Sequence, residues 1–411
     1  MVKMYSSVLK DKATLLIVLL ALSAPLFNLR IVASITIFDI FTLLACAIFL
    51  SRTINYKTVL LLCLFVTSVL VSEWSGLLAD LTSGEKKFDS LNILFRYLIL
   101  LFVMPYLSYK LFYSDSRVDM KIDLFYNSLI SSFFCVLVFN IYAIYFQLED
   151  YFLFQRFCSI YENPNTAALV LNLMSILFLF NTRHPIFLMR LFSYVSIPLT
   201  LVSLVVTGSY SGYIIQSIIL SIFLIKTANF KVVIFIGFVV AALISFDLSD
   251  IDEESQVLRG LSRFAGLVTI ISSDDDASIR KFGSADERMK SIESSLEELV
   301  TNPSYLFSGI GFGNVEALVE SNTGYRTSIH LSYLQLMISI GGFGTIVYLF
   351  IFLRIFGKIK RYFVGNLAIQ SILLLLTYLF SGIFVPHTYM SFYFAPIFPL
   401  LGLYGVNRNH G

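Results

Sequence analysis

The sequence has 411 residues, of which 57% are hydrophobic and 14% are charged. Soluble domains are roughly half apolar and about a quarter charged, so this composition indicates an integral membrane protein. The net charge of +2 says little, because the position of the charges matters more than their sum. The cysteines share no metal-ligand spacing, which argues against a zinc site or a disulfide framework; they are Cys46, Cys63, Cys135 and Cys158.

Apolar runs that are long enough to cross a bilayer recur along the chain. A hydrocarbon core about 30 Å thick requires roughly 20 apolar residues in helical form. The runs that meet this rule cover residues 13–29, 32–50, 58–77, 91–108, 124–146, 165–181, 186–206, 211–226, 231–247, 328–356, 366–384 and 388–406. We therefore predict an all-α membrane fold of about twelve spans. The first run has no cleavage pattern, so we interpret it as a retained helix and not as a signal peptide.

Basic residues alternate between the two sides of these predicted spans. Every second segment is basic, from the N-terminal lysines to residues 354–361. The short loops between them carry few basic residues, namely Arg30, Lys86, Lys87 and Arg156. Because positive loops stay on the cytoplasmic side, we expect both termini in the cytoplasm.

One long hydrophilic segment, residues 248–327, interrupts the apolar pattern. The alternation places it outside, after nine spans in residues 1–247 and before three spans in residues 328–411. A loop of this length in a compact membrane protein is usually functional.

An amphipathic helix is predicted inside this loop. Ser284 and Glu287 form a capping box, and Asn302-Pro303 ends the helix. Its apolar positions share one stripe, made of Met289, Ile292, Leu296, Leu299 and Val300. We expect the helix to lie on the outer membrane face or against the bundle.

Two arginines occupy apolar surroundings in this pattern. Arg288 falls at the edge of the stripe, in line with Ile292 and Leu299, where a guanidinium would need a partner. The alternative is a snorkelling arginine or an ion pair with a neighbouring glutamate. Arg96 lies inside the fourth predicted span, near its outer end. It is either a functional residue or one that snorkels to the interface.

Arginine outnumbers lysine among the outer basic residues, whereas lysine leads on the cytoplasmic side. The outer arginines are Arg30, Arg156, Arg259, Arg263, Arg280, Arg288 and Arg326. A guanidinium binds phosphate through two parallel hydrogen bonds, so this preference favours a phosphate-containing ligand.

His330 begins the tenth predicted span, directly after the long loop. An imidazole can take a proton from a hydroxyl near neutral pH, which suits a general base. A hydrogen-bonded interfacial histidine is the alternative. The acidic run Asp274–Asp276 has no histidine or further carboxylate at ligand spacing, so we interpret it as a solvated turn and predict no metal.

Glycines recur in two places. The pattern Gly309-x-Gly311-x-Gly313 opens no Rossmann unit and predicts a tight turn where backbone approaches backbone. A second group lies inside the tenth span and predicts close helix packing; it consists of Gly341, Gly342 and Gly344.

Several of these segments, in this order, resemble the O-antigen polymerase and ligase superfamily of bacterial envelope polysaccharide synthesis. They are Arg156 with Asn163-Pro164-Asn165-Thr166-Ala167-Ala168, the turn Thr207-Gly208-Ser209-Tyr210-Ser211-Gly212, Arg288 ahead of Asn302-Pro303 and Gly309–Asn314, and His330-Leu331-Ser332-Tyr333-Leu334 before Gly341-Gly342-x-Gly344. The resemblance covers about residues 150–350. The remaining spans match only in being hydrophobic.

The resemblance implies a glycosyltransferase of the bacterial inner membrane. Its donor would be an undecaprenyl diphosphate-linked oligosaccharide at the periplasmic face, with Arg288 and His330 catalytic and Glu162 and Glu287 as alternative bases. Substrate contacts are expected from Arg96, Arg156, Arg259, Arg263, Arg326, Asn163, Asn165 and Tyr210. A single inverting displacement needs no metal or cofactor. The expected partners are the lipid-linked donor, the bilayer and a polysaccharide chain-length regulator, with no nucleic acid.

Tyr210 stands where ligase-like members often carry arginine, which favours a polymerase over a ligase. A polymerase accepts a second lipid-linked repeat unit, whereas a ligase accepts a sugar of the lipid A core. A lipid-linked oligosaccharide transporter (a flippase) is the alternative from another class. The sequence has no visible internal repeat and one long loop on one side, which argues against a transporter. A structural scaffold would not need arginines facing the bundle.

Overall fold

The computed structural model describes residues 12–23, 30–32, 35–36, 56–78, 93, 96–114, 117–153, 156–161, 163–227, 283–323, 329, 331–383 and 395–406. The chain divides into two compact units. Unit 1 consists of Met1–Leu29, Met120–Asp275 and Gly365–Ser381. Unit 2 consists of Arg30–Asp119, Asp276–Val364 and Gly382–Gly411.

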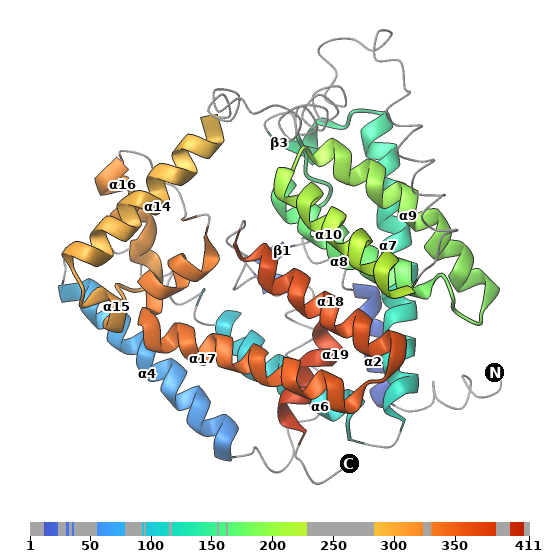
Figure 1. The fold of residues 1–411 in the computed structure, drawn as a ribbon, viewed down its shortest axis with the longest axis horizontal. Helices are drawn as coiled ribbons and strands as arrows, with labels where there is room; N and C mark the ends of the chain where they lie inside the picture. Colours follow the sequence, from blue (N-terminus) through green and yellow to red (C-terminus); the bar gives the residue numbers. More distant parts are fainter. Residues whose placement is uncertain are drawn as a thin grey trace. The chain divides into compact units, whose positions relative to one another are not determined.

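Unit 1 is built around a buried central helix, α8. Its helices are α2 (Lys12–Ser23), most of α7 (Val118–Tyr145), α8 (Pro164–Asn181), α9 (Phe187–Thr207), α10 (Tyr210–Thr227) and α18 (Gly365–Ser381). Helices α9, α10 and α18 pack against α8 (Figure 1), and every α8 residue from Thr166 to Leu179 is buried. Between α7 and α8 lie the short helix η3 (Glu149–Tyr151) and an antiparallel pair of strands, β3 (Phe152–Leu153) and β4 (Arg156–Phe157).

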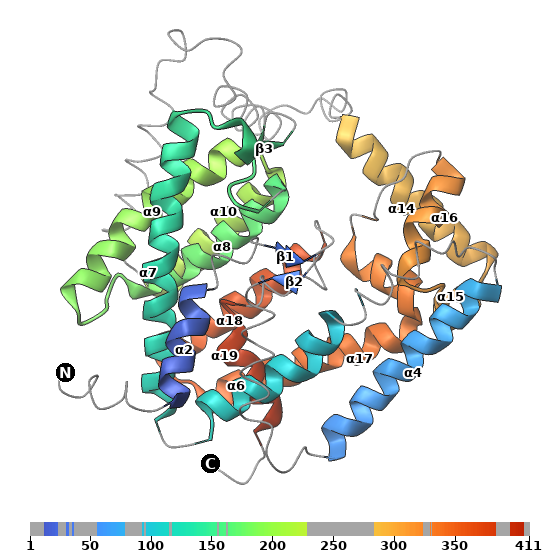
Figure 2. The same ribbon diagram turned by 180° about the vertical axis from the view of Figure 1, so that it is seen from behind.

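Unit 2 is organised along the long helix α17 (Ser332–Tyr362). Helices α4 (Tyr56–Leu78) and α15 (Tyr305–Ser308) pack on α17 (Figure 2). The other elements are β1 (Arg30–Val32), β2 (Ile35–Thr36), η2 (Ile99–Val103), α6 (Met104–Phe112), α14 (Gly283–Thr301), η5 (Phe312–Asn314), α16 (Val315–Thr323), α19 (Phe398–Leu401) and η7 (Gly402–Gly405). An apolar cluster joins α14, α16 and α17 through residues such as Leu299, Val319 and Ile338.

Four described helices are long and apolar enough to cross a membrane, namely α7, α8, α9 and α17. Shorter apolar helices lie within α2, α4, α10 and α18. The chain is therefore a helical protein with several apolar helices, as expected of a multi-pass membrane protein. Several predicted helix bounds agree with the structure to within two residues, including those of α4, α8, α9 and α10.

Two predicted spans differ from the described structure. Strands β1 and β2 form a small antiparallel pair where the predicted span 32–50 should begin, and the rest of that span lies outside the described residues, as does 231–247. The described part of the predicted span 388–406 contains only the short helices α19 and η7. Pro396 and Pro399 explain this, because proline has no amide hydrogen to donate within a helix. Ser108 Oγ donates to the Phe398 carbonyl at 2.7 Å and accepts the Gly402 N–H at 3.0 Å, so it lies between two groups that an α-helix would pair directly.

Helix α14 has the predicted bounds, and the residues of its predicted apolar stripe divide between a buried and an exposed face. Leu299 is buried as expected, whereas Leu296 and Val300 are 48% and 79% exposed. Ser291 and Ser295 are fully buried. The buried face repeats every 3.6 residues through 291, 295 and 299, and positions 296 and 300 are rotated about 100° away from it.

Candidate functional site

Arg156 on β4 closes the C-terminal end of α9. Its Nε donates to the Thr207 carbonyl at 2.9 Å, and one terminal nitrogen donates to the Gly208 carbonyl at 3.2 Å. The same nitrogen donates to Asn165 Oδ1 at 3.1 Å. The last carbonyls of a helix have no amide partner within the helix, and the guanidinium supplies hydrogen bonds to two of them. Its positive charge also offsets the partial negative charge at the C-terminal end of α9.

Asn163 and Asn165 connect the start of α8 to Arg156 and to the turn after α9 by hydrogen bonds. Asn163 is the N-cap of α8, and its side chain accepts the Asn165 N–H at 2.8 Å; Pro164 occupies the first helical position. Asn165 Oδ1 also accepts the Ser209 hydroxyl at 2.9 Å. A single amide oxygen therefore connects β4, α8 and the segment before α10.

The turn between α9 and α10 depends on two glycines. Gly208 has φ of 59°, the left-handed conformation that ends many helices. A Cβ at Gly212 would lie 2.7 Å from the Ala168 Cβ, so α8 and α10 touch at this point. Tyr210 begins α10 and meets the Tyr213 ring edge-on at 6.3 Å.

We call this arrangement the Arg156 corner; it comprises Arg156, Asn163, Asn165, Thr207, Gly208 and Ser209. It brings together two of the segments that carry the resemblance, namely Arg156 with Asn163–Ala168 and the turn Thr207–Gly212. The N-termini of α8 and α10, two helices of 18 residues, meet there beside the guanidinium. Helix N-termini carry partial positive charge, and the described side chains of the corner other than Arg156 are uncharged. The arrangement therefore favours an anionic group.

The neighbouring thiol and phenol do not supply a nucleophile or base near neutral pH. Burial raises the pKa of Cys158 to about 11, although a backbone hydrogen bond from Leu153 and the charge of Arg156 partly oppose the rise. Burial also raises the pKa of Tyr161. Both groups are therefore neutral, and the corner is suited to binding and positioning an anion.

In unit 2, a glycine turn (residues 309–314) packs its backbone on α17. Gly309 and Gly311 have φ of 70° and 88°. The amides of Ile310 and Gly311 donate to the carbonyls of Ile338 and Ser339, each at 2.9 Å. These carbonyls are available because α17 is interrupted at Gly341, where φ is 74° and ψ is 169°. The predicted backbone-to-backbone approach is confirmed.

The α17 glycines are needed for this contact, as the sequence predicted. A Cβ at Gly341 would overlap the carbonyl of Phe307, and a Cβ at Gly342 would lie 2.9 Å from the carbonyl of Leu306. A Cβ at Gly344 would lie 2.8 Å from the hydroxyl of Ser68 on α4. The absence of side chains therefore lets α15 and α4 pack directly on α17.

Glu73 on α4 holds the glycine turn and was not predicted from the sequence. Its Oε1 accepts the Phe312 N–H at 3.0 Å, and a Cβ at Gly311 would lie 2.8 Å from its Oε2. The ring of Tyr97 stacks on Phe312 at 5.1 Å. Glu73 is the only acidic residue in the predicted span 58–77, and that signal was sufficient to find it.

The remaining predicted residues are less fully described. The backbone of Arg288 lies on α14, one helical turn before the fully buried Ser291. Arg96 is half-buried and directly precedes the buried Tyr97. The others lie outside the described residues, and their roles stay predictions: His330, Arg259, Arg263, Arg326, Glu162 and Asp274–Asp276. Among the described residues, no group of three or more His, Cys, Asp and Glu is placed to hold a metal.

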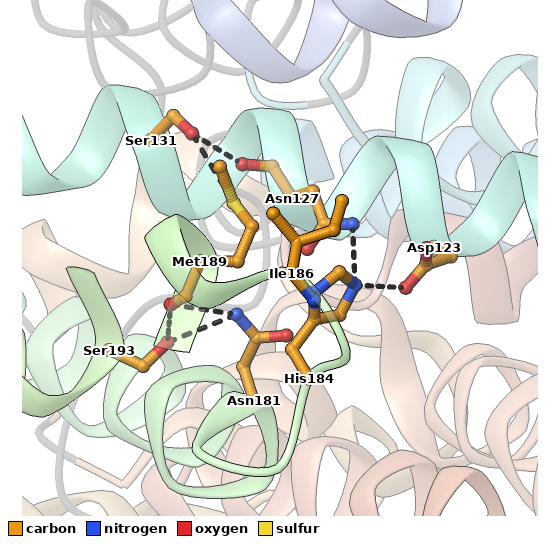
Figure 3. Close-up of polar contacts among 8 residues, drawn as sticks. All are labelled: Asp123, Asn127, Ser131, Asn181, His184, Ile186, Met189 and Ser193. Atoms are coloured by element: carbon orange, nitrogen blue, oxygen red, sulfur yellow. Dashed lines mark hydrogen bonds and ion pairs between the residues drawn. The ribbon is translucent and has the colours of Figure 1, made fainter. Parts of the chain in front are cut away.

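A second polar cluster lies at the other end of α8 and was also not predicted (Figure 3). His184 Nε2 is 3.5 Å from Asp123 Oδ1 and 3.2 Å from Asn127 Nδ2. Its Nδ1 lies 3.1 Å from the Ile186 N–H, which donates to it. Helix α8 is about 27 Å long, which separates this cluster from the Arg156 corner by nearly a bilayer core.

No protein-family model matches the chain, and no curated protein matches its sequence.

Proposed function

We propose that the chain is an O-antigen polymerase, a membrane glycosyltransferase that joins undecaprenyl diphosphate-linked oligosaccharide repeat units. The observation that supports it best is the Arg156 corner. Two segments that underlie the resemblance, Arg156 with Asn163–Ala168 and the turn after α9, share one set of hydrogen bonds there, although α8 and α9 separate them in sequence. A sequence resemblance made of loose pieces gains weight when the pieces meet in space.

The chemistry of the donor fits an anion-binding corner. As the glycosidic bond breaks, negative charge grows on the lipid diphosphate that leaves. A fixed guanidinium and two helix N-termini stabilise such charge without a metal. The hydrogen bonds of Arg156 to Thr207 and Gly208 fix the position of its charge, so in this proposal Arg156 attracts the diphosphate while Asn163 and Asn165 keep the helix ends in place.

The proposal assigns the chemical step to residues named by the resemblance. The oxygen of the acceptor hydroxyl forms a bond to the anomeric carbon, and the bond from that carbon to the diphosphate breaks. His330 takes the hydroxyl proton, with Glu162 or Glu287 as alternative bases, and Arg288 binds the diphosphate that leaves. One displacement inverts the anomeric centre. Further contacts to donor or acceptor come from Arg96, Arg259, Arg263, Arg326 and Tyr210.

The proposal includes a topology of twelve spans in the bacterial inner membrane. Both termini are cytoplasmic and residues 248–327 are periplasmic, so the Arg156 corner faces the periplasm and His184 faces the cytoplasm. Cysteine labelling tests this directly. A Ser272→Cys variant should react with a membrane-impermeant maleimide added from the periplasmic side. Labelling only from the cytoplasmic side would contradict the topology.

Deletion of the gene in its host tests the reaction. A polymerase deletion should leave lipopolysaccharide that carries a single repeat unit, because transfer to the core still works. Complementation with Arg156→Ala should not restore the long-chain ladder, although the protein remains in the membrane. If deletion instead gives bare core together with accumulated lipid-linked polymer, the protein is a ligase. Bare core with unpolymerised lipid-linked units would indicate a transporter.

A further inference from the structure

One face of α17 is exposed from residue 343 to the end of the helix. Its exposed residues recur every three or four positions, so they form one stripe along the helix surface. The first part of the stripe is apolar and 48–66% exposed; it consists of Phe343, Ile346, Phe350 and Leu353. The last part is basic, with exposed Lys360 and Arg361. A surface that is apolar over several turns and then cationic is complementary to a phospholipid with a negative headgroup.

Gly357 lies where the stripe changes from apolar to basic. It is exposed, and a Cβ added there would meet nothing within 4 Å. Residues three and four positions away are its neighbours on the helix surface. Three of these four neighbours are positively charged, and the fourth is the last apolar residue of the stripe. We call this open position the Gly357 notch; it is framed by Leu353, Arg354, Lys360 and Arg361.

The elements that pack around this end of α17 carry no carboxylate. Helix α17 contacts η7, and η7 contacts α6. Together with α19, these elements contain five basic residues and no acidic residue. The guanidinium of Arg354 lies over the ring of Tyr404, 5.2 Å from its centre, so it is held beside the notch by an uncharged partner. The positive charge at the notch is therefore not neutralised within these elements.

Lys358 has a different role from the three cations of the notch. Its Nζ donates to three backbone carbonyls around the end of η7, those of Leu403, Tyr404 and Val406. An ammonium group has three hydrogens, so these bonds use all of its donors. Lys358 thus fixes η7 to α17 and adds positive charge, while contacts to a ligand fall to the notch itself.

We propose that the Gly357 notch binds the headgroup phosphate of an anionic phospholipid, whose acyl chains lie along the apolar part of the stripe. Guanidinium and ammonium groups bind phosphate through charge-assisted hydrogen bonds, and glycine leaves room for the phosphate between them. From Phe350 to Lys360 the stripe is about 15 Å long, which is half of a hydrocarbon core about 30 Å thick. The inference requires only that α17 crosses a membrane, so it stands independently of the proposed enzymatic function.

Tryptophan quenching in vesicles tests the proposal, because lipids with brominated acyl chains quench a tryptophan that they touch. The single tryptophan, Trp74, would be replaced by phenylalanine, and Phe350→Trp would place a reporter on the stripe. The full-length protein would be reconstituted in phosphatidylcholine vesicles that contain a minor fraction of brominated phosphatidylglycerol or brominated phosphatidylcholine. We expect phosphatidylglycerol to bind at the reporter at least about threefold more tightly than phosphatidylcholine. Equal quenching by the two lipids would overturn the proposal.

Ile218→Trp on α10 is the matched control reporter. Ile218 is 42% exposed and lies about two turns before Lys226, the single basic residue of α10. The two brominated lipids should quench this reporter almost equally. The same preference for phosphatidylglycerol at Ile218 as at Phe350 would show that anionic lipid gathers around the whole protein, and it would overturn the assignment of a site.

Two variants of the Phe350→Trp protein distinguish a site from diffuse charge. Gly357→Leu fills the notch and keeps every charge, and leucine should fit because nothing lies within 4 Å of the added Cβ. It should lose most of the preference for phosphatidylglycerol, as should the combined variant Arg354→Gln, Lys360→Gln and Arg361→Gln. Full preference in Gly357→Leu would overturn the proposal.

Inorganic phosphate provides the last comparison. It should reduce the preference no more than sodium chloride of the same ionic strength, because the acyl chains contribute to binding of the lipid. Loss of the preference with phosphate alone would assign the notch to a free anion and overturn the assignment to a lipid.

Discussion

The Arg156 corner and the glycine turn both hold a loop against helices, but by opposite means. At the corner, a long charged side chain reaches two backbone carbonyls at the end of α9. At the glycine turn, backbone amides reach the carbonyls of the interrupted helix α17 directly. The first contact depends on what a side chain adds, and the second depends on side chains being absent. Substitutions should therefore remove hydrogen bonds at the corner and create steric overlap at the turn.

The largest effect is expected at Gly341. Alanine there meets both a φ of 74° and overlap with the Phe307 carbonyl, so Gly341→Ala should destabilise the purified protein by on the order of 4 kcal/mol or prevent its folding. Gly357 is the matched control, because it lies on the same helix and a Cβ added there would meet nothing within 4 Å. Gly357→Ala should be neutral or stabilising by up to about 1 kcal/mol. Equal melting temperatures for the two variants would contradict the steric explanation.

Substitution of Arg156 should have the next largest effect. Arg156→Ala removes three hydrogen bonds, so that the carbonyls of Thr207 and Gly208 lose their protein donor. We expect the free energy of unfolding to fall by roughly 2 kcal/mol. Arg156→Lys keeps the charge without the planar fork and should recover only part of this stability. Arg190→Ala, at an exposed position on α9, serves as the control. A melting temperature for Arg156→Ala as high as that of Arg190→Ala would show that the corner does not hold the end of α9.

Glu73 allows a sharper comparison, because glutamine keeps the oxygen that accepts the Phe312 N–H. If Glu73 only positions the glycine turn, Glu73→Gln should retain activity within about twofold, whereas Glu73→Ala should destabilise by about 1 kcal/mol and lose activity. The measurements are polymer synthesis and thermal melting of both variants. A glutamine variant that is stable but inactive would show that the negative charge itself is required.

The smallest effect is expected at the N-cap of α8. Asn163→Ala should destabilise by about 1 kcal/mol, because the Asn165 N–H loses its acceptor. Asn163→Asp keeps the acceptor and adds a charge that suits a helix N-terminus, so it should match the native protein in stability. The same charge should weaken binding of an anionic donor and raise KM. Equal destabilisation by both substitutions would argue against a capping role.

The structure also shows which features could be predicted from the sequence. The bounds of α8 and α9 were predictable because both helices carry local signals, Asn163-Pro164 at the start of one and Gly208 at the end of the other. The glycine turn was predictable for the same reason, since only glycine tolerates such close approach of backbone.

The distant partners of Glu73 and His184 were not predictable, even where the residue itself carried a sequence signal, as Glu73 did. Glu73 accepts the Phe312 N–H, and His184 lies within 3.5 Å of Asp123. No local sequence pattern connects the two positions of either pair. The face that α14 buries is set by its packing on α16 and α17, which buries Ser291 and Ser295 in place of Leu296 and Val300. The resemblance named Arg156 with Asn163–Ala168, and the turn after α9 separately, but it did not reveal that the guanidinium bonds to the backbone carbonyls of that turn.

The most direct test of the proposed function is polymerisation by the purified protein. Liposomes that contain the protein would be incubated with an undecaprenyl diphosphate-linked oligosaccharide in the presence of EDTA, and the glycans separated by size. We expect a ladder of multiples of the repeat unit together with released undecaprenyl diphosphate, and no ladder with Arg156→Ala or His330→Ala. An unchanged oligosaccharide, from folded native protein and with divalent ions restored, would contradict the assignment as a polymerase.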